Sequence, residues 1–179
     1  MAILSALAEG RTRLGDIANR ALGPTGHNQA TFYLQTLQNL RLVERIVPIT
    51  ETQPHKSRRG IYRICDPFLR FWFRFVLPEQ TRLEMGLAEH VLEQRIRPDF
   101  QSFCAPIFED ACRSFVLRAK LPFAPVQVGS WWSSQAEVDV VAFNQDHSEV
   151  LLGECKWSDR PVGENVLADL DAKATELLR

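Results

Sequence analysis

The order of apolar and polar positions predicts three helices and a hairpin in the first third of the chain. From residue 28 onward, apolar residues at 30, 33, 34, 37 and 40 recur at the spacing of an amphipathic helix. Two shorter apolar stretches precede it. Gly10 ends the first stretch, and a loop at residues 21–26 separates the second from the helix that begins at residue 28. The predicted elements are helices at residues 3–8, 14–20 and 28–40, strands at residues 42–49 and 61–64, and a polar loop at residues 50–60.

The third predicted helix has amide and hydroxyl side chains on its outer face, and the loop between the two strands is basic. Three helices followed by a hairpin with a basic tip resemble a winged helix-turn-helix domain. In such a domain a helix can enter the major groove of DNA, where amides pair with base edges, while cations on the wing contact phosphates. The residues predicted to contact DNA are Asn28, Gln29, Thr31 and Gln35 on the helix and Lys56, Arg58 and Arg59 on the loop. Winged helices also bind proteins, so a protein-interaction module is the alternative.

A strongly apolar helix is predicted next. Asp66 and Pro67 are a good N-cap and first helical residue, and Pro78 is the predicted end. Between them, aromatic and aliphatic residues lie nearly all round the helix, interrupted only by Arg70 and Arg74. A helix this apolar is expected to be buried on most of its surface. We therefore predict a connecting helix wedged between two domains, with no chemistry of its own.

The second half of the chain is predicted to contain one long helix, three strands and a final helix. The long helix, at residues 101–119, carries Glu109 at the edge of its apolar stripe. The strands are predicted at residues 126–132, around residues 137–142 and around residues 151–156, with the final helix at residues 164–179.

Charged residues interrupt the last two predicted strands. Because side chains alternate between the faces of a strand, Glu137, Asp139 and Val141 should share one face. If the hairpin closes symmetrically about residues 146 and 147, residues whose numbers sum to 293 pair across it. Asp139 then lies opposite Glu154, and Glu137 opposite Lys156. Unpaired charge is costly in apolar strands, so these side chains should pair or bind something.

Composition and charge narrow the class of protein. Hydrophobic residues make up 45% and charged residues 24% of the chain, as is typical of a folded soluble protein. There is no long apolar run or signal-peptide pattern, so we expect a cytoplasmic protein without a membrane partner. Residues 1–80 carry 11 Lys and Arg against 6 Asp and Glu (+5), and the remainder carries 10 against 16 (−6). The first part suits nucleic acid and the second suits a cation. The four cysteines have no zinc-ligand spacing.

The predicted order of helix, three strands and helix, with these charged positions, resembles the core of the PD-(D/E)xK nuclease superfamily. Asp139 is followed after fourteen residues by Glu154-Cys-Lys156, and Glu109 lies on the preceding helix. With the winged helix and the aromatic helix, the chain also resembles the C-terminal region of archaeal-type P-loop ATPases, a domain of unknown function. It contains no GxxxxGK[ST] motif, so a P-loop ATPase module would be a separate partner.

The resemblance implies a mixed α/β (α+β) chain in three parts. These are a winged helix-turn-helix at residues 1–64, aromatic connecting helices at 65–100 and an αβββα restriction-endonuclease-like domain at 101–179, without the last strand that the superfamily core usually has. Val138 replaces the proline that many members have before the aspartate.

The resemblance also implies a chemistry and a set of site residues. The implied function is DNA cleavage dependent on Mg²⁺ or Mn²⁺, with DNA as the partner. The implied catalytic residues are Glu109, Asp139, Glu154 and Lys156: the two strand carboxylates would hold the metal, Glu109 could add a ligand, and Lys156 would orient the nucleophile or stabilise the transition state. Two alternatives remain open: a salt-bridge network in which Glu137 pairs with Lys156, and a non-catalytic regulatory or docking domain of an ATPase.

Overall fold

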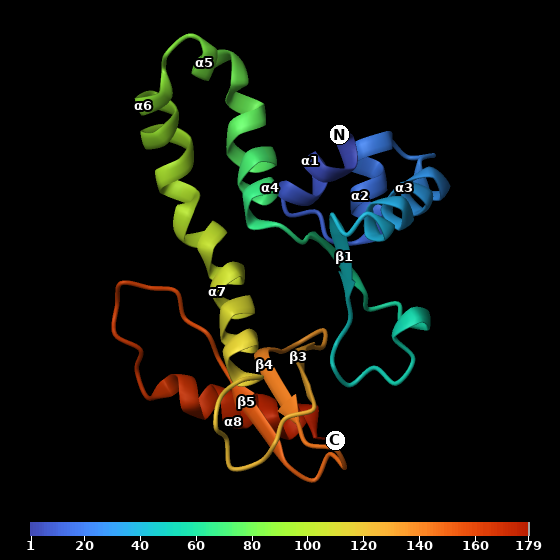
Figure 1. Cartoon of the computed structure of the whole chain (residues 1–179), viewed down its shortest axis with the longest axis vertical. Coiled ribbons are helices and arrows are strands. Elements are labelled where there is room, and N and C mark those ends of the chain that lie inside the picture. Colours follow the sequence, from blue (N-terminus) through green and yellow to red (C-terminus); the bar gives the residue numbers. More distant parts are fainter. Residues whose placement is uncertain (179) are drawn as a thin grey trace. The chain divides into compact units, whose positions relative to one another are not determined.

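Three helices and a two-stranded sheet pack around an apolar core in the N-terminal part of the computed structural model, which describes residues 1–178 (Figure 1). The fold is mixed α+β, with two small antiparallel sheets. The chain divides into two units: Met1–Ile46 with Ser57–Asp99, and Val47–Lys56 with the residues from Phe100 onward. No helix within residues 1–178 has both the length and the apolar composition needed to cross a membrane.

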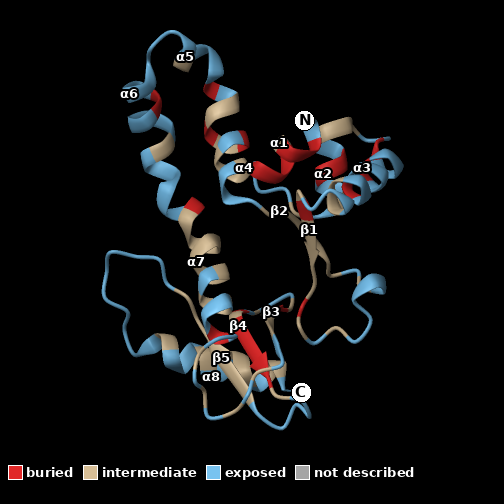
Figure 2. Cartoon of the chain, viewed as in Figure 1, coloured by how far each residue is buried: buried red, intermediate tan, exposed pale blue. Residues whose placement is uncertain are grey.

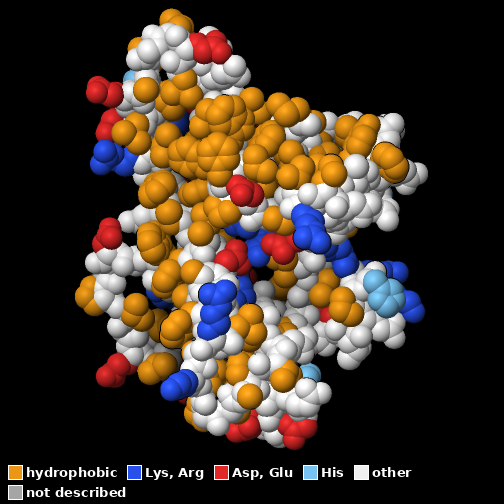
Figure 3. Space-filling model, viewed as in Figure 1, with side chains coloured by type: hydrophobic (Ala, Val, Ile, Leu, Met, Phe, Trp, Pro, Cys, Tyr) orange, Lys and Arg blue, Asp and Glu red, His pale blue; other side chains and the backbone are white. Residues whose placement is uncertain are grey.

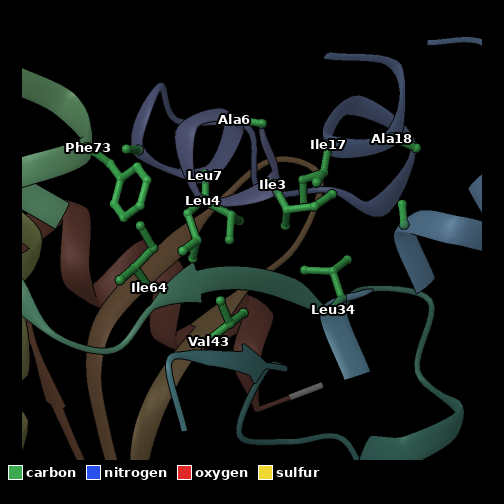
Figure 4. Close-up of a cluster of buried hydrophobic side chains, with 12 residues drawn as sticks. Ile3, Leu4, Ala6, Leu7, Ile17, Ala18, Leu34, Val43, Ile64 and Phe73 are labelled. Atoms are coloured by element: carbon green, nitrogen blue, oxygen red, sulfur yellow. The ribbon is translucent and has the colours of Figure 1, made fainter. Parts of the chain in front are cut away.

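The core of the first unit is built from helices α1 (Ala2–Ala8), α2 (Leu14–Leu22) and α3 (His27–Asn39) and strands β1 (Val43–Ile46) and β2 (Ile61–Ile64). Positive φ angles of 88° at Gly10 and 82° at Gly23, which glycine adopts without strain, occur where α1 and α2 end. The strands are antiparallel and pair Val43 with Ile64. The buried side chains that meet in this core are Ile3, Leu4, Ala6, Leu7, Ala8, Ile17, Ala18, Ala30, Leu34, Val43, Ile64 and Phe73 (Figure 4).

Helix α4 (Pro67–Phe71) begins as predicted, with Asp66 Oδ1 accepting a hydrogen bond of 2.9 Å from Leu69 N. Its predicted end at Pro78 is wrong. The helical path continues through a π-helical turn (Trp72–Val76) and a 3₁₀ turn (Leu77–Glu79) into α5 (Gln80–Glu84). Proline lacks an N–H and clashes with the carbonyl four residues earlier in an α-helix, and the change of helical turn relieves this conflict.

After α5 the chain turns back and forms the second arm of a helical hairpin. The same succession of helical turns occurs in this arm. Helix α6 (Ala88–Val91) continues into a π-helical turn (Leu92–Ile96) and a 3₁₀ turn (Arg97–Asp99) that contains Pro98. The two paths are linked by Glu79, which is 9% exposed and accepts hydrogen bonds from Arg82 (2.8 Å) and Arg95 (3.0 Å). The Glu79 carboxylate therefore joins the two arms of the helical hairpin.

The predicted burial of the aromatic helix is wrong in part. Phe73 and Phe75 are buried, whereas Phe68 is 67% exposed and Trp72 is 38% exposed. The rings of Phe68 and Trp72 contact each other, with centroids 6.3 Å apart. On the face drawn in Figure 3, hydrophobic side chains gather over the first unit around α4. The helix thus presents an apolar surface as well as filling the core.

The second unit contains a three-stranded antiparallel sheet, which has apolar residues on both faces, and two helices. Its elements are α7 (Phe100–Val116), β3 (Gln127–Trp132), β4 (Glu137–Phe143), β5 (Val150–Gly153) and α8 (Asn165–Leu177), with β4 at the centre of the sheet. Val140 and Ala142 of β4 pack with Val116 of α7, whereas Val138, Val141 and Phe143 belong to a second cluster that includes Leu170 and Leu177 of α8. Strand β4 is accordingly buried along most of its length (Figure 2).

The predicted strand at residues 42–49 is too long, because β1 ends at Ile46. The next residues belong to the second unit. Ile49 N donates to Ser130 O (2.9 Å), Gln127 Nε2 donates to Ile49 O (3.2 Å), and the Ile49 side chain packs in the cluster with Trp131. Ile49, predicted to end the strand before the polar loop, is therefore bonded to β3 instead.

Candidate functional site

Charged side chains from α7, β4, the segment after β5 and α8 interact electrostatically at one place in the second unit. We call the four acidic members, Glu109, Glu137, Asp139 and Glu154, the carboxylate cluster. Three cations accompany it: Arg113, Lys156 and Lys173. The structure therefore brings together all four residues that the resemblance implies, although they come from three different elements or segments.

A bulge in β4 orients Asp139. Gly129 pairs with Val141 but Trp131 pairs with Val138, so two residues of β4, Asp139 and Val140, lie opposite one residue of β3. The bulge breaks the predicted alternation in which Asp139 and Val141 share a face. In the structure the Asp139 carboxylate interacts electrostatically with Glu109 on α7 as well as with Lys173 on α8.

Both the backbone and the side chain of Asp139 are held by hydrogen bonds. Arg113 Nη1, on α7, donates to Asp139 O (2.5 Å), and Asp139 Oδ2 accepts from Cys155 N (2.7 Å). Arg113 also contacts two acidic residues of its own helix, Asp110 at 2.7 Å and Glu109 at 3.7 Å. The bulge is thus connected to α7 on one side and to the segment after β5 on the other.

Glu154 lies between two lysines. The register sum of 293 is confirmed for the four pairs from Val140 with Gly153 to Phe143 with Val150. Strand β5 ends at Gly153, so the prediction that Glu154 lies in a strand is wrong. Its Oε1 accepts from Lys156 Nζ (2.6 Å), and its Oε2 accepts from Lys173 Nζ (2.7 Å). The predicted salt bridge from Glu137 to Lys156 is wrong, since Lys156 pairs with its near neighbour Glu154.

The four carboxylates have pKa values that reflect this environment. Burial, together with the negative charge of Asp139, raises the pKa of Glu109 to about 7. Burial also raises the pKa values of Glu137 and Asp139, and neighbouring carboxylates add to both shifts. Burial acts to raise the pKa of Glu154 as well, but the hydrogen bonds from Lys156 and Lys173 hold it below its usual value.

The donor chemistry of the carboxylate cluster fits a hard divalent cation. Its oxygens are the ligands that Mg²⁺ and Mn²⁺ prefer, and a bound cation would relieve the repulsion among the carboxylates. In the arrangement of residues 1–178, however, no group of three or more histidine, cysteine, aspartate or glutamate side chains is placed to hold a metal ion. Both carboxylate oxygens of Glu154 are instead paired with the ammonium groups of Lys156 and Lys173.

Lys173 and Arg113 were missed from the sequence. Arg113 lies four residues after Glu109, a helical spacing that could have indicated the ion pair. Lys173 lies nineteen residues after Glu154 on α8, and its contact depends on how α8 packs against the sheet. Trp157, the residue after Lys156, contacts α7: its ring and that of Phe108 lie 5.4 Å apart between centroids.

The residues predicted to contact DNA are mostly exposed. Asn28, Gln29, Thr31 and Gln35 are exposed on α3, and Lys56 and Arg58 are exposed on the loop. Arg59 is only partly exposed, and its carbonyl accepts from Arg13 Nη1 (2.8 Å). Lys56 belongs to the second unit, whereas α3 and Arg58 belong to the first.

The exposed face of α3 is more apolar than predicted. Tyr33, expected in the buried stripe, is 45% exposed, and the neighbouring Phe32 is 66% exposed. Their rings contact each other, with centroids 5.9 Å apart. Leu40, also expected in the stripe, is 62% exposed. The stripe is therefore limited to Ala30 and Leu34, with Leu37 partly buried.

Comparison with known proteins identifies relatives without a described activity. Residues 72–173 match a family of archaeal and bacterial proteins of unknown function, DUF234. An uncharacterized protein of Methanocaldococcus jannaschii is 35% identical over 161 residues, which cover 88% of this chain and 35% of the relative. The chain thus spans about a third of the length of the curated relative it matches. No solved structure matches. The family match covers more than half of the chain and includes the whole carboxylate cluster and all three cations.

Proposed function

This chain belongs to the DUF234 family, and we propose that its second unit is a metal-dependent phosphodiesterase module that cleaves DNA. The observation that carries the proposal is the carboxylate cluster beside Lys156. Acidic side chains whose pKa values are raised by burial and by one another's charge, next to a lysine, are characteristic of sites that bind a divalent cation and a phosphate.

Chain order supports a nuclease-like fold for this unit. The elements run α7, β3, β4, β5, α8, and the acidic residues lie on α7, at the bulge of β4 and directly after β5. This is the order of helix, three strands and helix in the PD-(D/E)xK core that the motif resembles. The likeness of arrangement makes a nuclease the first hypothesis, but function depends on the site rather than on the fold.

Each residue has a proposed role that follows from its contacts. Asp139, oriented by the Cys155 N–H, and Glu154 would hold Mg²⁺ or Mn²⁺, with Glu109 as a further ligand. The bound ion would supply Lewis acidity, polarising the phosphate and lowering the pKa of water. Lys156, whose side chain is 44% exposed, would contact the phosphate and stabilise the charge that builds in the transition state.

The first unit is proposed to be a winged helix that delivers the module to DNA. Polar side chains exposed on α3 and the exposed Arg58 support this proposal. Phe32 and Tyr33 would lie on the same surface, and aromatic rings can stack on unpaired bases. A P-loop ATPase partner would be supplied by a segment or chain other than these 179 residues.

The second candidate is a non-catalytic docking module, and two observations favour it. Both oxygens of Glu154 are already paired with lysines, which is what a purely structural network would require. In addition, Phe68 and Trp72 form an exposed aromatic pair that suits a protein partner.

Calorimetric titration separates the two candidates. Mn²⁺ or Mg²⁺ is titrated into the wild-type protein and into Asp139→Ala. The nuclease proposal predicts millimolar or tighter binding that is lost in Asp139→Ala. Absence of binding in the wild type, or binding that Asp139→Ala leaves unchanged, would favour the docking module. Glu164→Ala, an exposed acidic residue at the start of α8, is the matched control and should leave binding intact.

A further inference from the structure

Two cysteine side chains meet in the second unit. Cys112 lies on α7, and Cys155 lies two residues after the end of β5. Both pack against the buried group formed by Val116, Val140 and Ala142. Their thiols are hydrogen-bonded to each other, and both side chains are partly exposed. Two segments that are far apart in the sequence thus bring a pair of free thiols into contact.

Two hydrogen bonds to Asp139 keep these segments together independently of the sulfur atoms. Arg113, the residue after Cys112, donates through Nη1 to Asp139 O (2.5 Å). The backbone N–H of Cys155 donates to Asp139 Oδ2 (2.7 Å). Since one residue of β4 is bonded next to each cysteine, the contact between the thiols follows from the packing of α7, β4 and the segment after β5.

We propose that Cys112 and Cys155 are an oxidisable pair that forms a reversible disulfide by exchange with a low-molecular-weight disulfide such as oxidised glutathione. The Cys112 thiolate attacks one sulfur of glutathione disulfide, forms a mixed disulfide and releases one glutathione thiolate. Cys155, after losing its proton, attacks Cys112 Sγ, forms the internal S–S bond and releases the second glutathione thiolate. The two cysteines lose two electrons and two protons, and glutathione disulfide takes up both to become two thiols.

The environment of Cys155 suits the second step better than the first. Burial raises the pKa of its thiol to about 12, and the hydrogen bond with Cys112 adds to the shift. A protonated thiol attacks a reagent in solution slowly, whereas a mixed disulfide on Cys112 is held in contact with Cys155. The exchange should therefore be slow near neutral pH, so its equilibrium is a better measurement than its rate.

The disulfide would connect two parts of the carboxylate cluster covalently. Glu109 lies three residues before Cys112 on α7, and Glu154 and Lys156 are the neighbours of Cys155. An S–S bond between the two segments would fix the distance that separates them. The inference goes beyond the proposed cleavage of DNA and does not depend on it.

Equilibration in a glutathione redox buffer tests the pairing. Wild-type protein is incubated with oxidised and reduced glutathione until its composition is constant, and is then quenched with acid, alkylated, digested and analysed by mass spectrometry. The expected product is a link between Cys112 and Cys155. By thermodynamic linkage, a disulfide that stabilises the fold forms more favourably in the folded protein by the same factor. The equilibrium constant for oxidation should therefore be at least about tenfold larger in buffer than in denaturing urea.

The remaining cysteines provide matched controls. Cys104 lies on the same helix as Cys112, and Cys65 lies in the first unit. Cys104→Ser and Cys65→Ser should retain the link and its dependence on folding, and Cys112→Ser should lose the link. Thermal melting of each variant checks that it is folded.

Other products would overturn the inference. They are free thiols or mixed disulfides with glutathione at Cys112 and Cys155 in the folded protein, a link through Cys104 or Cys65, and a link that forms equally well in urea. Because the measurement involves neither metal nor DNA, each of these results would leave the proposed function standing. A link between Cys112 and Cys155 that depends on folding supports the inference even if the protein cleaves no DNA.

Discussion

Asp139 Oδ2 accepts a hydrogen bond of 2.7 Å from the backbone N–H of Cys155, which lies between Glu154 and Lys156. The bond joins the bulge in β4 to the segment after β5 at the point where the strand ladder has ended. It brings Asp139 close to the Glu154-Cys-Lys156 segment, although no strand pairing connects these residues. The side chain of Asp139 is therefore both a member of the carboxylate cluster and a structural link within it.

The raised pKa of Glu109 makes stability depend on pH in a definite direction. Its pKa is about 7 in the folded protein and near the ordinary value of 4.5 in the unfolded chain. At pH values below 4.5 the group is protonated in both states and has no effect. Between pH 4.5 and about 7 the unfolded state ionises first, so stability falls as pH rises through this window.

Glu109→Gln should remove that loss. In metal-free buffer we expect the variant to match the wild type near pH 5 and to exceed it at pH 8 by about 1 kcal/mol, after allowance for the screening of a carboxylate that is 26% exposed. Chemical denaturation at several pH values measures this difference. The same substitution at the exposed Glu89 is the control. A stability difference between variant and wild type that does not change with pH would contradict the assigned environment of Glu109.

Glu79 should be essential to the stability of the helical hairpin. Replacing it with alanine removes the shared partner of Arg82 and Arg95 from a site that is 9% exposed. Since both guanidinium groups are partly solvated, we expect a loss of about 2 kcal/mol rather than the larger cost of a fully buried pair. Urea denaturation measures the free energy of unfolding. Glu84→Ala, five residues further along and exposed, should cost far less. Equal losses would show that Glu79 does not stabilise the hairpin.

The sequence predicted local structure better than tertiary geometry. The spacing of apolar residues located α3, β2 and β3 closely, and the Asp66-Pro67 pair located the start of α4. Pro78 was misleading because a π-helical turn, which has no simple sequence pattern, lets the helical path continue.

The sequence singled out the four acidic side chains and Lys156, but it indicated neither Arg113 and Lys173 nor the contacts among these residues. Period-two alternation put Asp139 and Val141 on one face, and only the pairing with β3 reveals the bulge that separates them. The symmetric hairpin gave the correct register sum, yet it could not indicate where pairing ends. Lys173 reaches Glu154 through the packing of α8, which is long-range information that local spacing does not contain.

DNA binding by the proposed winged helix can be tested through its salt dependence. Each phosphate contact that is lost reduces the slope of log affinity against log salt by about 0.9. Lys56→Ala with Arg58→Ala should reduce the slope by about 2 if both exposed cations contact phosphates. Arg59→Ala is the matched comparison, and we expect a smaller change because Arg59 is only partly exposed. Fluorescence anisotropy with a labelled duplex measures the slope, and an unchanged slope in the double variant would argue for a protein partner instead.

The carboxylate cluster is proposed to perform metal-dependent phosphodiester cleavage. The most direct test is incubation of supercoiled plasmid with Mn²⁺ and wild type, Asp139→Ala, Lys156→Ala or the Glu164→Ala control. We predict nicking by the wild type and the control, at least a hundredfold less by the two site variants, in line with the loss of a charge-stabilising group, and none when Mn²⁺ is chelated. Cleavage that persists unchanged in both site variants, or a wild type that does not cleave although it binds Mn²⁺, would contradict the claim.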